Sequence, residues 1–135
     1  MANAWYNDFK RALQEKELDV KDDGPKVSLI DGADYTFSAS HTSYASDVGS
    51  GAKVAAASLS TPSISGSGVF DSDDWVWTAV TGDPSEIIVL WLDTPSSPVA
   101  DPLMAYFDTG MTGMPVTPGG GDINGTVHGS GWWDL

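Results

Sequence analysis

The sequence has no cysteine among its 135 residues. This excludes a disulfide framework, a thiolate metal site and a cysteine nucleophile. Long apolar runs are also lacking. The longest, Ile87–Leu92, has six residues, whereas a membrane-spanning helix needs about 20. A secretion signal needs a continuous apolar stretch near the start of the chain, and Asp8, Lys10 and Glu15 interrupt this one. We therefore expect one soluble domain, long enough to bury a core of its own.

Basic residues are absent from the last three-fifths of the chain. Residues 54–135 hold ten acids and no Lys or Arg, which gives −10 of the total net charge of −13. Such a surface repels phosphate backbones and anionic lipids, so the sequence predicts no nucleic-acid or membrane partner. It favours a cationic partner, although solubility alone would also explain it. The six basic residues are Lys10, Arg11, Lys16, Lys21, Lys26 and Lys53.

One helix is predicted, from Asn3 to Leu18. Asn3 is a suitable N-cap, because its side-chain oxygen can accept a bond from an otherwise unpaired backbone N–H. Trp5, Phe9 and Lys16 follow the three- and four-residue spacing of one helical face. An isolated helix of this length is marginal in water, so its aromatic stripe must pack on something. Its own β domain and a neighbouring subunit are both open as the surface that it meets.

The rest of the chain predicts short strands separated by turns rich in Gly, Pro and Ser. The run Glu86–Asp93 is apolar on both faces, which is typical of a central strand buried on both sides. Helices do not alternate with strands, so a parallel α/β sheet is not expected. The other expected extended segments are Lys26–Asp31, Asp34–Phe37, Ala52–Leu59, Trp75–Val80, Leu103–Asp108 and a last strand or hairpin in Gly125–Leu135.

These patterns predict a mainly β protein, either an antiparallel β-sandwich or a partly open barrel, with one N-terminal helix. We expect residues 1–20 to form the N-terminal helix or arm and residues 21–135 to form the β-sandwich domain.

Candidate catalytic and metal-binding residues are few. His41 and His128 show no metal-ligand spacing, and no Gly-x-Ser-x-Gly elbow is present. Asp93 and Asp108 each end an expected apolar strand, where a cleft residue of a glycosidase pair could lie, but an Asp that ends a strand before a turn is also common for backbone reasons alone. The acidic run Asp71–Asp74 lacks the Gly and Glu of a calcium-binding loop. The sequence predicts no catalytic residue, metal ligand or cofactor, and a protein that is not an enzyme.

Trp132 and Trp133 are adjacent near the end of the chain. Neighbouring residues of a strand face opposite sides, so they cannot both point inward if this segment is a strand. One of them should meet the helix, a partner chain or a ligand. Exposed aromatic side chains are enriched in protein interfaces and also stack on sugars.

From end to end the chain resembles a group of small bacteriophage virion proteins. The similarity begins with Met1-Ala-Asn-Ala and the helix, and is strongest in Leu103–Gly110 (LMAYFDTG), Met114–Pro118 (MPVTP) and Gly119–Asp122 (GGGD). These are strand and turn patterns, and the alanine-rich segment 54–58 and the paired tryptophans depart from them.

The resemblance implies a capsid decoration (cement) protein that is made in the host cytoplasm and stabilises the outer surface of the head. Its partners would be the major capsid protein and copies of itself, with a trimer as one possibility. A tail or fibre component and a lectin-like module that binds host glycans are the alternatives. The N-terminal third would face the particle and the acidic remainder would face outward. The expected partner-interface residues are Trp5, Phe9, Lys10, Arg11, Lys16, Trp132 and Trp133.

Overall fold

In a computed structural model of the chain, residues 3–93 and 99–134 are described. Met1, Ala2 and Leu135, which belong to segments discussed above, lie outside them. The elements of the first half are β1 (Ala4–Trp5), α1 (Asn7–Gln14), β2 (Pro25–Ile30), α2 (Tyr44–Asp47), β3 (Lys53–Ser58) and β4 (Ser63–Ile64). Those of the second half are β5 (Val69–Asp71), β6 (Trp75–Trp77), β7 (Ile87–Leu92), β8 (Leu103–Phe107), β9 (Ile123–Gly125) and β10 (Trp133–Asp134).

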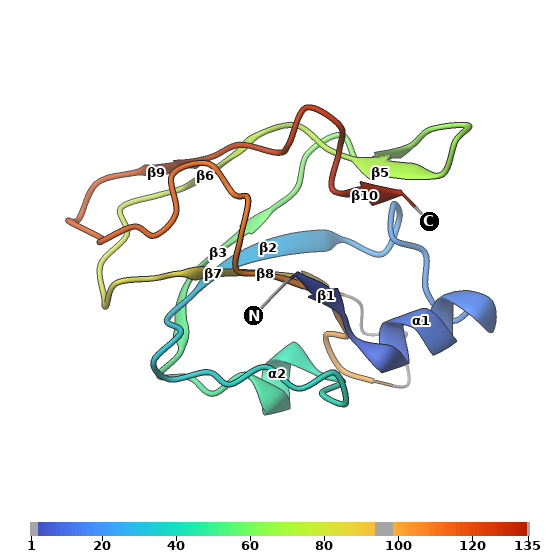
Figure 1. Cartoon of the computed structure of the whole chain (residues 1–135), viewed down its shortest axis with the longest axis horizontal. Helices are drawn as coiled ribbons and strands as arrows, with labels where there is room; N and C mark the ends of the chain where they lie inside the picture. Colours follow the sequence, from blue (N-terminus) through green and yellow to red (C-terminus); the bar gives the residue numbers. More distant parts are fainter. Residues whose placement is uncertain (1–2, 94–98, 135) are drawn as a thin grey trace.

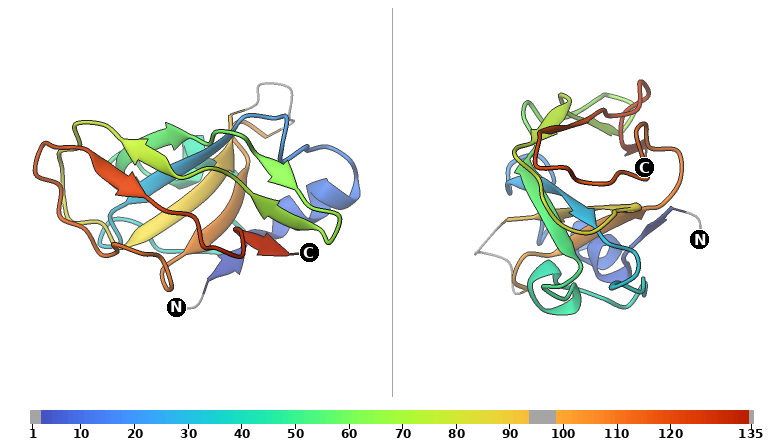
Figure 2. Two further views of the ribbon diagram at one scale, coloured as in Figure 1. Left: turned by 90° about the horizontal axis from the view of Figure 1, so that it is seen from above. Right: turned by 90° about the vertical axis from the view of Figure 1, so that its left-hand side faces the viewer.

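The strands form one large and two small antiparallel sheets. The five-stranded sheet has the order β1-β8-β7-β2-β3, and the small sheets are β10-β5-β4 and β6-β9. The small sheets lie over one face of the large sheet, while α1 and α2 lie toward its opposite side (Figure 1; Figure 2). This architecture confirms a mainly β, antiparallel fold with a helix near the N-terminus.

Strand β7 is the middle strand and all six of its residues are buried. On one face, Phe107 of β8 stands opposite Ile88 and its ring lies 5.5 Å from that of Trp132 in the covering layer. On the other face, Trp91 stacks on Tyr44 of α2 at 4.2 Å. The prediction of a central strand buried on both sides is therefore confirmed, with a different layer on each side.

The expected extended segment Trp75–Val80 is shorter in the structure, where β6 ends at Trp77, and its side chains alternate in burial. Trp75 and Trp77 are buried, whereas Val76 is 46% exposed. The Trp77 indole Nε1 donates to the Val27 carbonyl at 3.2 Å, which joins the small sheet to the large one. Trp75 lies flat against Gly125 of β9, where an added Cβ would come within 2.0 Å of the indole ring. Only glycine fits at that position.

The predicted helix from Asn3 to Leu18 was too long. Tyr6 is the N-cap, the helix ends at Gln14, and Lys16 beyond it has a φ of 59°. Asn3 does not cap the helix, because its Oδ1 accepts backbone N–H bonds from Asp108 and Thr109. The residues between Asn3 and Tyr6 form β1 on the edge of β8, so Trp5 lies on a strand. Pairing with the sheet thus replaces the first helical turn.

Two further segments differ from expectation. Asp34–Phe37 is a turn followed by irregular chain, in which Asp31 Oδ1 accepts the Ala33 N–H at 2.8 Å. The short strand β5 was not predicted, yet it is the middle strand of its sheet and pairs with β10. Strands of two or three residues carry too little alternation to be recognised in a sequence.

A buried chain of hydrogen bonds ties the start of α1 to the segment after β2. The hydroxyl of Tyr6, a fully buried residue, lies 2.8 Å from that of Tyr35, which lies 2.9 Å from His41 Nδ1. Burial, with the Tyr35 bond second, raises the pKa of Tyr6 well above its usual range. Both phenols therefore stay neutral and serve as hydrogen-bonding groups.

We predict that Tyr6→Phe lowers the free energy of unfolding by about 1 kcal/mol, because it removes one buried hydrogen bond while keeping the ring. Chemical denaturation of the variant and the wild type measures the difference. His41→Phe is the control. His41 lies at the partly exposed end of this series of hydrogen bonds, so its replacement should lower the free energy of unfolding by less. Equal stability of Tyr6→Phe and the wild type would show that the bond contributes nothing.

The Asp47 carboxylate closes the turn that leads into α2. Its Oδ2 accepts the backbone N–H groups of Ser43 at 2.9 Å and Thr42 at 2.7 Å. These two bonds hold the pKa of Asp47 below its usual value. A carboxyl with a lowered pKa in the folded state stabilises the fold above its unfolded pKa, and this stabilisation is lost as the pH falls through the folded value.

We predict that Asp47→Asn lowers the free energy of unfolding at neutral pH, and that its difference from the wild type shrinks as the pH falls below about 4, the ordinary Asp value, and through the lower folded value. The neutral amide cannot lose a charge on acidification, so the variant lacks this part of the acid sensitivity. Denaturation across that pH range tests it. A difference that is independent of pH would contradict the assigned role of the carboxylate.

Candidate functional site

Two of the seven residues expected at a partner surface lie in the core. Phe9 is 1% exposed and Trp132 is 7% exposed. Phe9 faces the sheet because α1 packs against β8, and Trp132 packs on Trp75 at 5.1 Å. Their assignment to an exposed interface is therefore corrected.

Trp133 meets the N-terminal segment of the same chain. Its ring lies 5.8 Å from Trp5, 5.8 Å from Phe9 and 4.8 Å from Phe70. The two adjacent tryptophans face different surroundings, but strand alternation is not the reason, because β10 begins at Trp133 and Trp132 lies before it. Trp133 contacts the helix through Phe9, which is one of the three expected neighbours.

Arg11 is surrounded by carboxylates. Its guanidinium pairs with Asp8 at 2.7 Å, with Glu17 at 2.9 Å and with Glu15. The Arg11 bond holds the pKa of Glu17 below its usual value. The positive charge of Arg11 is balanced by carboxylates within the helix region. Arg11 was expected to contribute to a cationic face, and it does not.

Trp5 and Lys10 share a shallow hollow of about 330 Å³ on the outer side of α1 with Leu13 and Gln14. We call these four residues the helix patch. Within the part of the chain that the structure describes, no carboxylate pairs with the Lys10 ammonium. The patch combines a cation with apolar surface. Lys16 lies apart from it, in a more polar hollow beside Asp19 and Asp23.

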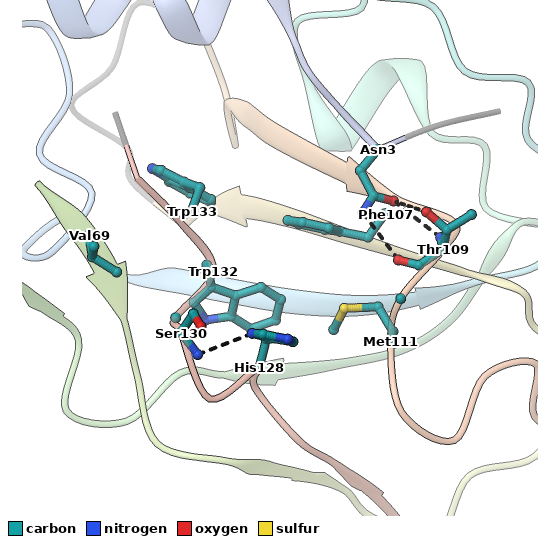
Figure 3. A pocket seen from close by; sticks show the side chains of 11 residues that line it. Asn3, Val69, Phe107, Thr109, Met111, His128, Ser130, Trp132 and Trp133 are labelled. Atoms are coloured by element: carbon teal, nitrogen blue, oxygen red, sulfur yellow. Dashed lines mark hydrogen bonds between the residues drawn. The ribbon is translucent and has the colours of Figure 1, made fainter.

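A second hollow, of about 420 Å³, opens between the C-terminal segment and the end of β8 (Figure 3). We call it the aromatic cavity. The rings of Phe107 and Trp132 lie in contact, 5.5 Å apart, and His128 lies beside Trp132. Its lining residues are Asn3, Val69, Phe107, Thr109, Gly110, Met111, His128, Ser130, Gly131, Trp132 and Trp133.

Hydrogen bonds fix the walls of the aromatic cavity. The Trp132 indole donates to Ser72 Oγ at 2.9 Å, and its backbone N–H donates to Phe70 at 2.8 Å. Gly131 has a φ of 86°, and an added Cβ would come within 2.6 Å of Val69, so glycine is required before Trp132. The adjacent tryptophans were the only sequence signal for this site, because its walls come from four separate parts of the chain.

The candidate catalytic groups are not assembled. Asp93 follows β7 and Asp108 follows β8, and these antiparallel strands place the two residues at opposite ends of the sheet. At about 3.3 Å per residue they are roughly 20 Å apart, whereas glycosidase carboxyl pairs lie about 5–9.5 Å apart. His41 Nδ1 bonds to Tyr35 and His128 Nδ1 accepts the Ser130 N–H.

The acidic segment 71–74 behaves as a set of turn and loop caps. Asp71 accepts the Ser72 N–H, Asp73 accepts the Thr61 hydroxyl and Asp74 accepts the Val127 N–H. A different trio of carboxylates was not anticipated: oxygens of Asp31, Asp34 and Asp83 lie within 4.8 Å of one another. Asp31 is buried and the other two are exposed, and carboxylate oxygens are the ligands that hard cations prefer. Asp31 and Asp34 are three residues apart, but Asp83 comes from a distant part of the chain, so no local motif predicts the trio.

No family model and no curated protein matches this chain. Among residues 3–93 and 99–134, no helix is long and apolar enough to cross a bilayer.

We predict that Trp133→Ala lowers the free energy of unfolding by about 2 kcal/mol, because three aromatic rings lose a partner. Thermal and chemical denaturation of the isolated chain measure it. Val76→Ala removes an exposed side chain and should change stability by less than about 0.5 kcal/mol. A neutral Trp133→Ala would mean that this tryptophan serves a partner instead of its own fold.

Proposed function

We propose that this chain is a structural protein of a bacteriophage particle that decorates the outer surface of the capsid. The likeness of its strand and turn patterns to small virion proteins suggests the class. The helix patch is the observation that carries the proposal, since it is where two of the expected interface residues, Trp5 and Lys10, share one surface hollow.

The composition of the helix patch suits a protein interface. Trp5 supplies aromatic surface, Leu13 supplies aliphatic surface and Lys10 supplies an unbalanced charge. Aromatic residues are enriched at the centre of protein interfaces, where few residues carry most of the binding energy. The patch would take an apolar surface with acidic neighbours on the capsid lattice.

The charge distribution supports an orientation with α1 toward the shell. Basic residues occur only within the first 53 positions, and the rest of the chain carries ten acids. An acidic face directed at solvent keeps neighbouring copies soluble and steers cationic groups toward the particle surface. Arg11 is balanced within the helix region, so Lys10 is the cation that the helix patch itself offers.

Many copies on a repeating lattice allow a small interface to hold. A patch of four residues would bind weakly by itself, but subunits that also contact one another engage several sites at once. A homo-oligomer, with a trimer as one form, fits this arrangement.

We predict that Lys10→Glu weakens binding to particles that lack the protein by about tenfold at low salt, because it reverses the charge of the helix patch. Sedimentation of the labelled protein with such particles measures binding. Lys21→Glu makes the same change of charge at an exposed lysine outside the patch and is the matched control. Equal loss in both variants would contradict the assigned patch and point to net charge alone.

Electron microscopy of purified particles tests the location. Density for the chain on the outer surface of the head supports decoration, with α1 toward the shell. Density only on the tail would overturn the decoration role in favour of a tail or fibre component.

A further inference from the structure

We propose that the aromatic cavity binds a neutral saccharide. The cavity and the helix patch share no lining residue, although Trp133 of the cavity packs on Trp5 of the patch. Sugar binding does not require the decoration role. Its chemistry, and not its size alone, points to this ligand.

Among the described residues, the lining of the aromatic cavity holds no Asp, Glu, Lys or Arg. This is notable in a chain whose net charge is −13. A ligand that sits in such a lining has no counter-charge to meet, and the acidic surroundings repel an anion. These two facts favour an uncharged ligand. The volume of about 420 Å³ falls within the range of small-molecule sites.

The walls offer what a sugar ring needs on its apolar face. The rings of Phe107 and Trp132 pack against each other, with centroids 5.5 Å apart, and together form the floor of the cavity. Met111 lines the side. A pyranose ring presents C–H groups on one face and hydroxyl groups around its edge. The C–H face would lie against the aromatic floor, which is held by the Trp132–Ser72 bond.

The rim offers hydrogen-bonding groups for the hydroxyl edge. His128 Nδ1 accepts the backbone N–H of Ser130 at 3.1 Å. This bond requires Nδ1 to be unprotonated, so the neutral ring carries its proton on Nε2 as a donor. Within the described residues, neither His128 Nε2 nor Ser130 Oγ has another partner. Asn3 and Thr109, by contrast, are committed to one another.

A smaller hollow of about 180 Å³ continues from the aromatic cavity and shares four lining residues with it, Phe107, Thr109, Gly110 and Met111. Glu86 lines this smaller hollow, and its Oε2 accepts the Gly32 N–H at 2.9 Å. A fixed carboxylate is a strong acceptor for hydroxyl groups. The two hollows together would suit a sugar with a second residue or a substituent better than a single small ring.

An extended peptide fits this place less well. Peptides commonly bind by adding a strand to an exposed sheet edge, and the edge strand beside the cavity, β10, has only two residues. A cationic peptide would also find no carboxylate among the described residues that line the aromatic cavity. The observations therefore favour the saccharide, and a peptide is included in the test.

Saturation-transfer NMR of the full chain tests the proposal. The probes are methyl glucopyranoside, methyl galactopyranoside, N-acetylglucosamine and their disaccharides, with glucuronic acid as the anionic comparison and a short Leu-Lys peptide as the alternative. We expect saturable transfer to at least one neutral sugar and none to glucuronic acid. Transfer to the peptide or to glucuronic acid, without any to the neutral sugars, would overturn the proposal, as would no transfer at all.

Variants then assign the site. His128→Phe keeps a ring but removes the donor, and Ser130→Ala removes the hydroxyl, so each should weaken sugar binding by about tenfold. Ser67→Ala, at an exposed serine on the β4–β5 turn, is the matched control and should bind as the wild type does. Lys10→Glu should also bind normally, which separates failure of this site from failure of the helix patch. Unchanged affinity in both cavity variants would refute the site.

Discussion

The fold depends on covering both faces of β7. All six residues of β7 are buried, and they point alternately to the two faces of the sheet. A single covering layer would shield only one of these faces from water. The small sheets cover the first side through Trp77 and Trp132. The segment between β2 and β3 covers the second, with Tyr44 stacked on Trp91. The irregular stretches of the chain are therefore as necessary to the core as the strands are.

This layered arrangement also determines where buried polar atoms and basic side chains lie. The layers meet through buried polar atoms such as the Trp91 indole, which donates to Ser28 Oγ at 2.8 Å. Of the six basic residues, Arg11 and Lys26 are paired with carboxylates and Lys53 lies over the Tyr44 ring. Basic residues occur only in the first part of the sequence. In the folded chain this leaves a few exposed lysines near α1 on a largely acidic surface.

The sequence was most informative where a pattern was long. The apolar run around β7 predicted a strand buried on both sides, because six consecutive apolar residues are typical of a central strand. The start of the chain was misread, since Asn3 and Trp5 satisfy a helical pattern but pair with β8 once the sheet exists. The aromatic cavity could not be derived in advance. Residues such as Asn3, Phe107 and His128 meet only through tertiary packing, although Trp132 and Trp133 marked one of its walls.

The packing of indole rings gives the chain an optical property of its own. Trp75 lies 5.4 Å from Trp77, edge to face, and 5.1 Å from Trp132, nearly parallel. Chromophores this close share their electronic excitations, so the ultraviolet transitions of the three rings belong to the group. Because they come from β6 and from the segment before β10, their coupled circular dichroism reports the packing of these two parts of the covering layer against each other.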